Sequence, residues 1–180
     1  EERGFHSSIC TTFDVDFGAY EAVALSRLRG AHCTNNILVA DSRMLTYSVD
    51  GRSLPRLAGN KYSVVGITPS NGGVFHPKLV LQLGESSGRL LVASANMTSA
   101  GLGGNLEVVG QVALSAPDGP EMGLLRSAFD YLDALIPPEA EAAREQLAWA
   151  LRRTPWLDGA VPTGEVADAD GAVLARFLAH

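Results

Sequence analysis

Five polar side chains between residues 74 and 109 of this 180-residue sequence combine the residue types that phosphate chemistry requires. They are His76, Lys78, Ser94, Asn96 and Glu107, and each lies at or beside the end of an apolar run. A histidine supplies a nucleophilic imidazole, a lysine supplies a positive charge, and an asparagine supplies two N–H donors. With a carboxylate beside them, these groups could converge on one phosphate group.

The spacing of these residues suits a site built on strand ends. His76 and Lys78 are two residues apart, so on a strand their side chains point to the same face, and the same holds for Ser94 and Asn96. Each residue alone has an ordinary structural explanation: a satisfied histidine at a strand start, a surface lysine, a turn asparagine or a solvated carboxylate at a strand end. Their combination in one segment favours the site.

The two spacings resemble the signature of the phospholipase D superfamily, which pairs H-x-K on one strand with S-x-N after the next strand. Residues 76–78 read HPK and residues 94–96 read SAN. The resemblance runs from about residue 11 to residue 114, and TTFDVDFGAYEAVALSRLRG and ASANMTSAGLGGNLE look like segments of the nuclease-like members.

This resemblance implies a role for each of the five residues. It implies that His76 attacks phosphorus and forms a covalent phosphohistidine. Lys78, Ser94 and Asn96 would bind the phosphate. Glu107 matches a carboxylate that orients a histidine in nuclease members. The chemistry of the superfamily needs no metal and no cofactor, so neither is expected here.

Two positions depart from the superfamily pattern. Many relatives carry an aspartate five residues after the lysine, where this chain has Leu83, and the residue before the motif serine is often glycine, where this chain has Ala93. Branches without that aspartate still cleave phosphodiesters, so the catalytic interpretation stands.

Composition narrows the class of protein. Nine acidic residues balance nine Lys and Arg residues in residues 1–115, so the whole net charge of −6 lies in residues 116–180 and argues against a broad nucleic-acid surface there.

The longest apolar runs are far shorter than the ~20 residues of a membrane span, so no membrane partner is expected. Cys10 and Cys33 lack metal-ligand spacing and are interpreted as buried free thiols, which suits the cytoplasm.

Hydrophobic periodicity predicts an α/β domain with a mixed, mostly parallel sheet and helices on both faces. Pro77 cannot donate to a ladder, which predicts that its strand start lies at a sheet edge or a bulge. Strands are expected at residues 9–17, 36–40, 62–67, 80–83, 89–95 and 106–114, and helices at residues 20–28, 43–49, 122–135 and 140–151.

The resemblance covers a single H-x-K unit, which predicts a phospholipase D-like nuclease domain at residues 1–153 and an extension or linker at residues 154–180. The leaving oxygen needs a general acid, which in this superfamily is usually a second histidine. Either a homodimer brings two copies of His76 together, or a longer chain carries a second half beyond His180.

The sequence therefore predicts a metal-independent phosphodiesterase, with DNA as the favoured substrate. Two alternatives stay open. One is a phospholipid hydrolase or transferase, which would require exposed apolar loops. The other is a catalytically inactive binding or dimerisation module with the same fold, which Leu83 slightly favours.

Overall fold

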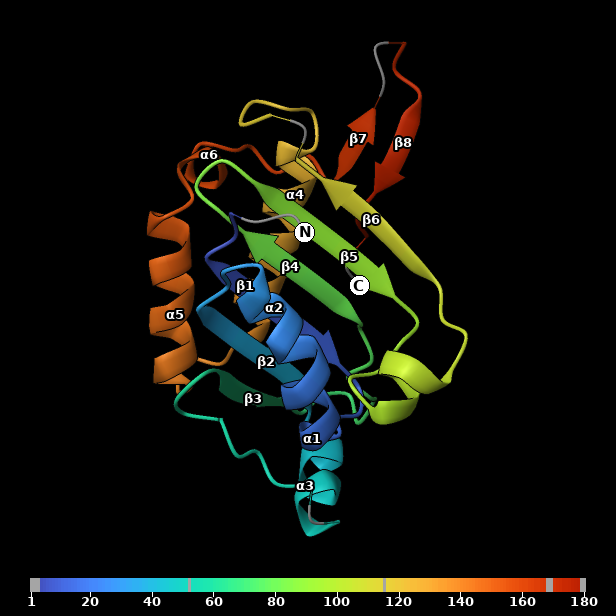
Figure 1. Cartoon of the computed structure of the whole chain (residues 1–180). Coiled ribbons are helices and arrows are strands. Elements are labelled where there is room, and N and C mark those ends of the chain that lie inside the picture. The colour runs from blue at the N-terminus through green and yellow to red at the C-terminus, as the bar shows by residue number, and fades with distance from the viewer. Residues whose placement is uncertain (1–3, 52, 115, 168–169, 179–180) are drawn as a thin grey trace.

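A computed structural model describes residues 4–51, 53–114, 116–167 and 170–178, and its centre is a six-stranded sheet (Figure 1). The strands lie in the order β3-β2-β1-β4-β5-β6. They span Ser7–Thr12 (β1), Asn35–Asp41 (β2), Ser63–Ile67 (β3), Leu79–Leu83 (β4), Gly88–Ala93 (β5) and Val109–Ala113 (β6). The first strand therefore lies beside the strand that follows His76.

The sheet is mixed, but the prediction that it is mostly parallel is wrong. β1 pairs in parallel with β2, and β2 with β3, whereas β4 is antiparallel to β1, β5 to β4 and β6 to β5. Parallel neighbours need a crossover connection, which helices supply only in the first part of the chain. A short turn joins β4 to β5, so that pair forms an antiparallel hairpin.

Helices connect the parallel strands. Between β1 and β2 run α1 (Phe17–Ala19), a π-helical segment η1 (Tyr20–Leu25) and α2 (Ser26–Gly30), and α3 (Ser42–Asp50) connects β2 to β3. Asp16 caps the first of these helices, because its carboxylate accepts a hydrogen bond from the Ala19 N–H at 3.2 Å. The π-helical turns were not predicted.

Successive side chains of the central strands point to opposite faces of the sheet and pack into two apolar clusters, one on each face. On one face, Cys10 and Leu38 pack with residues of the helices between β1 and β2. On the other, Ile9, Ile37 and Leu81 pack with the later helices. Figure 1 shows α2 in front of the sheet and α4 behind it.

The prediction that Pro77 marks an edge or a bulge is also wrong. β4 lies between β1 and β5 in the middle of the sheet, and it begins at Leu79, two residues after the proline. Pro77 thus precedes the ladder and interrupts none of its hydrogen bonds. The segment between β5 and β6, expected as a loop, contains a π-helical turn, η2 (Ala100–Gly104).

The rest of the chain packs largely against one face of the sheet. It forms α4 (Met122–Leu135), α5 (Glu141–Arg152), α6 (Pro155–Asp158) and a hairpin of β7 (Glu165–Ala167) and β8 (Val173–Arg176). Trp156 and Leu157 of α6 are buried in the same cluster as Leu81. The predicted division at residue 153 stays a prediction, and residues 168–169 and 179–180 of its second part lie outside the described residues.

Both cysteines are buried free thiols, as predicted. Cys10 and Cys33 have no exposed surface, and burial raises the pKa of the Cys10 thiol to about 12. Among the described residues, no helix combines the length and apolar character needed to cross a bilayer.

Candidate active site

Four strand ends meet where the sequence places its polar residues. Because β1 and β5 run opposite to β4 and β6, the carboxyl ends of β1 and β5 lie beside the amino ends of β4 and β6 (Figure 1). The H-x-K segment immediately precedes β4, the S-x-N segment follows β5, and Glu107 precedes β6. Strand direction alone therefore delivers all five predicted residues to one end of the sheet.

His76 and Lys78 contact each other directly. The Lys78 Nζ lies 2.9 Å from Nδ1 and 3.2 Å from Nε2 of the His76 ring, and 3.2 Å from the His76 carbonyl oxygen. The ring of Phe13, just beyond β1, lies 4.9 Å from the imidazole at a tilt of 43°. The tautomer of the imidazole decides which of the two ring nitrogens accepts a hydrogen bond from the ammonium.

Lys78 is less exposed than His76, and its surroundings act on its charge in two directions. Partial burial lowers the pKa of the Lys78 ammonium, while the negative charge of Glu107 opposes that fall. The electrostatic effect links Glu107 to the H-x-K pair, although the two belong to different strand ends.

Ser94 and Glu107 form a second contact at this end of the sheet. The Ser94 hydroxyl donates a hydrogen bond to the Glu107 carboxylate and accepts one from the Val108 N–H at 3.0 Å. Asn105 Nδ2 donates to the other carboxylate oxygen at 3.3 Å. Glu107 thus lies against Ser94 and Asn105, and its predicted contact with a histidine stays a prediction.

The side chain of Asn96 is oriented by the loop that follows β1. Its Oδ1 lies 3.4 Å from the Thr12 hydroxyl and 3.4 Å from the Asp14 N–H. Within the described part of the chain, the Asn96 Nδ2 donates to no protein acceptor. Because the oxygen end of the amide is engaged, the N–H end remains to bind an anion.

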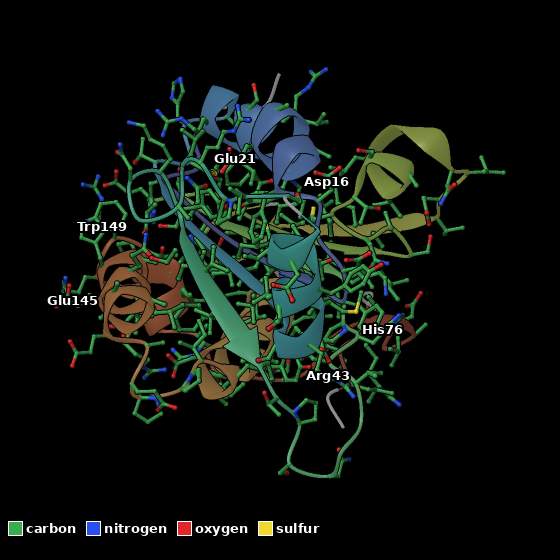
Figure 2. The ribbon with its side chains drawn as sticks, turned by 90° about the horizontal axis from the view of Figure 1, so that it is seen from below. Asp16, Glu21, Arg43, His76, Glu145 and Trp149 are labelled. Atoms are coloured by element: carbon green, nitrogen blue, oxygen red, sulfur yellow. The ribbon has the colours of Figure 1, made fainter. Side chains whose placement is uncertain are left out.

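A buried carboxylate that the sequence analysis did not single out holds the segment before His76. Asp41, 1% exposed at the end of β2, accepts hydrogen bonds from the Phe75 N–H at 3.0 Å and the Arg43 N–H at 3.0 Å. The Arg43 guanidinium also donates to the Gly73 carbonyl at 2.7 Å. Figure 2 shows Arg43 and His76 on the same side of the molecule.

Two opposing effects act on the pKa of the Asp41 carboxyl group. Burial alone would raise the pKa of Asp41, but hydrogen bonds from Arg43 and Phe75 outweigh burial and hold the pKa below its ordinary value. No sequence signal separated Asp41 from an ordinary helix cap, because its partner Phe75 is distant in the chain.

In the described residues, no three His, Cys, Asp or Glu side chains gather as metal ligands would.

Comparison with known proteins gives matches of fold only. No family model and no curated protein matches the sequence. The crystal structure of yeast tyrosyl-DNA phosphodiesterase matches with a TM-score of 0.51 at 17% identity, over 82% of this chain and 36% of that chain. The SCAN1 mutant of yeast tyrosyl-DNA phosphodiesterase 1 matches with a TM-score of 0.51 at 18% identity, over 80% and 34%.

Both matches are to yeast tyrosyl-DNA phosphodiesterase, and at this identity they show a likeness of fold alone. The chain spans about a third of the length of that enzyme.

Proposed function

We propose that this chain is a metal-independent phosphodiesterase, most directly a DNA nuclease, that acts through a covalent phosphohistidine on His76. The contact of Lys78 Nζ with both ring nitrogens of His76, at 2.9 and 3.2 Å, carries the proposal. It places a positive charge directly beside the imidazole that would act as the nucleophile, where the charge can also hold a phosphoryl oxygen. The fold shared with yeast tyrosyl-DNA phosphodiesterase supports DNA as the substrate class.

The reaction divides into two displacements. First, a lone pair on a His76 ring nitrogen forms a bond to phosphorus while the bond to the leaving oxygen breaks. Then water attacks phosphorus and gives its proton to the second histidine, which lost its own proton to the leaving oxygen, while the N–P bond breaks and the imidazole recovers its lone pair. Lys78 and the Nδ2 of Asn96 hold the phosphoryl oxygens as negative charge builds in each transition state. Ser94 binds the phosphate, and Glu107 orients a histidine.

The first displacement needs an acid to protonate a DNA leaving oxygen, and a second histidine supplies it. That histidine comes from a dimer mate or from a second half of a longer chain. In the second arrangement, residues 1–153 are the nuclease domain and residues 154–180 lead toward the other half. The two buried thiols favour a reducing compartment such as the cytoplasm.

An activated substrate tests the proposal without the second histidine. The p-nitrophenyl ester of thymidine monophosphate releases a phenolate that needs no protonation, so one half-site can complete the first displacement. With EDTA present, the chain should release a burst of p-nitrophenolate equal to the number of His76 residues, and His76→Ala should release none. A dimer or a longer chain should also nick plasmid DNA in EDTA. Loss of all cleavage on chelation would contradict the proposal.

A specific observation supports phospholipid hydrolysis as a second candidate. Leu106 and Val108, on either side of Glu107, are 103% and 76% exposed, and Val109 beside them is 58% exposed. Such apolar side chains around a phosphate site suit contact with lipid. Phosphatidylcholine vesicles separate the candidates, because the nuclease should leave them intact while it cleaves the nucleotide ester.

A further inference from the structure

β1 ends in two threonines whose hydroxyl groups have no exposed surface to bind water. Thr11 and Thr12 are both 0% exposed, and because they are consecutive strand residues their side chains point to opposite faces of the sheet. Both lie at the end of β1 where the four strand ends meet. Their partners lie in the two motif segments.

Thr11 holds the H-x-K segment. Its hydroxyl accepts a hydrogen bond from the Leu79 N–H at 2.9 Å and donates one to the Pro77 carbonyl at 3.0 Å, so it binds the backbone on both sides of Lys78. The backbone pairing of β1 with β4 ends at Cys10 and Val80. The Thr11 side chain therefore continues the connection where the backbone ladder stops.

Thr12 holds the S-x-N segment. Its hydroxyl accepts a hydrogen bond from the Met97 N–H at 3.0 Å and donates to the Asp14 carbonyl at 2.7 Å. The Asp14 N–H and the Thr12 hydroxyl both lie 3.4 Å from the Asn96 Oδ1. One hydroxyl thus fixes the backbone after Asn96 and the turn that faces the Asn96 amide.

We propose that Thr11 and Thr12 are a pair of positioning residues that set Lys78 and Asn96 in register with each other. One motif segment precedes β4 and the other follows β5, and β1 contributes a hydroxyl to each. This inference rests on the proposed function, because it assigns the pair to the phosphate site of that reaction. Neither threonine is placed to touch the substrate, so each acts through the residue it holds.

Valine substitutions test the pair, because valine keeps the branched shape and lacks the hydroxyl. Thr11→Val and Thr12→Val should each slow the p-nitrophenolate burst by roughly 10- to 100-fold, as expected for a catalytic group displaced by about an ångström. Thr11→Ser and Thr12→Ser, which keep the hydroxyl, should restore most of the rate. Thr46→Val is the matched control, because that exposed threonine donates only within α3 and should leave the burst unchanged.

A double-mutant cycle separates positioning from loss of stability. In an Asn96→Ala background, Thr12→Val should cause little further loss, because the group it positions is gone, whereas Thr11→Val should keep its full effect. In a Lys78→Ala background the order should reverse. Equal effects of both valine variants in every background, or no rescue by serine, would overturn the inference.

Inactivity of the unmodified chain toward every phosphodiester would defeat the proposed function, and a second measurement would then decide the inference. In a crystal structure of Thr12→Val, the Asn96 amide should move away from the Asp14 N–H while Lys78 keeps its place. An Asn96 side chain that keeps its position would overturn the inference on geometry alone.

Discussion

β4 has the candidate catalytic residues immediately before its first residue, whereas its last residue, Leu83, lies in the apolar core. The start of the strand lies at the same end of the sheet as the S-x-N segment and Glu107, and the His76 side chain there is exposed. At the other end, Leu83 has no exposed surface and packs in the same cluster as Leu125 and Trp156. The start of this five-residue strand thus belongs to the candidate site, and its end belongs to the apolar core.

This difference explains the most evident departure from the superfamily pattern. The position where many phospholipase D superfamily members carry an aspartate is Leu83 in this sequence, about 17 Å of extended strand from Lys78 at the usual rise per residue. A leucine there completes the core and removes no group from the candidate site. It therefore gives little support to the interpretation as an inactive module.

His76→Ala should give the largest effect and should act only on the chemistry. Without the imidazole no N–P bond can form, so the burst should fall by at least about 10³-fold. The side chain is exposed, so the free energy of unfolding measured in urea should change by no more than about 0.5 kcal/mol. His32→Asn is the control, because asparagine tolerates the positive φ of 74° at that position. A burst that survives in His76→Ala would remove His76 from the reaction.

Leu83→Asp should act in the opposite way. A carboxylate at this fully buried position, in an apolar cluster, would lose its hydration, so stability should fall by about 3 kcal/mol or more. The fraction that stays folded should cleave no faster than the unmodified chain. Leu106→Asp, at a fully exposed leucine, should leave the unfolding free energy nearly unchanged. Faster cleavage by Leu83→Asp would mean that the core end of β4 takes part in the chemistry.

Gly101→Ala should cause a smaller loss at the catalytic end. A Cβ at Gly101 would overlap the Asn96 carbonyl oxygen and lie 2.9 Å from the Asn96 nitrogen, so the backbone of Asn96 must shift. We expect the burst rate to fall about tenfold. Gly103→Ala is the matched control in the same turn, because a Cβ there meets nothing within 4 Å. Equal rates for the two variants would show that the position of Asn96 is unimportant.

Glu107→Gln should have the smallest effect, seen chiefly in the dependence of rate on pH. The pKa of Lys78 is already lowered by burial, and the charge of Glu107 opposes that shift. Removing the charge lowers the Lys78 pKa further, so the protonated lysine is lost at lower pH. The alkaline limb of the kcat/KM profile should therefore move to lower pH. Glu85→Gln, in the turn beyond the other end of β4, should leave the limb in place, and a shift to higher pH in Glu107→Gln would contradict this account.

The sequence predicted the local elements of the site better than their partners. The apolar runs correctly predicted two consecutive strands, Leu79–Leu83 and Gly88–Ala93, but the H-x-K and S-x-N segments lie just outside these strands, not on them as expected. Local patterns contain no information on which strand lies beside β4, so they could not reveal that β1 is its neighbour. The hydrogen bonds of Thr11 and Thr12 to the two motif segments exist only because β1 lies beside β4, so the sequence could not predict their positioning role.

The two wrong predictions have related causes. Pro77 was interpreted as an edge signal because a proline withdraws a ladder donor, but here the ladder starts two residues later and the Thr11 hydroxyl bonds the proline carbonyl. A mostly parallel sheet was expected from the early alternation of strands and helices. The later strands are joined without crossover helices and are antiparallel.

Mass spectrometry of the chain stopped during the p-nitrophenolate burst tests the central claim most directly. The account predicts a covalent thymidine monophosphate adduct on the peptide that contains His76, present at high pH, released by acid, and missing in His76→Ala. An adduct on another residue, or a full burst with no adduct, would contradict the claim that the imidazole at the start of β4 attacks phosphorus.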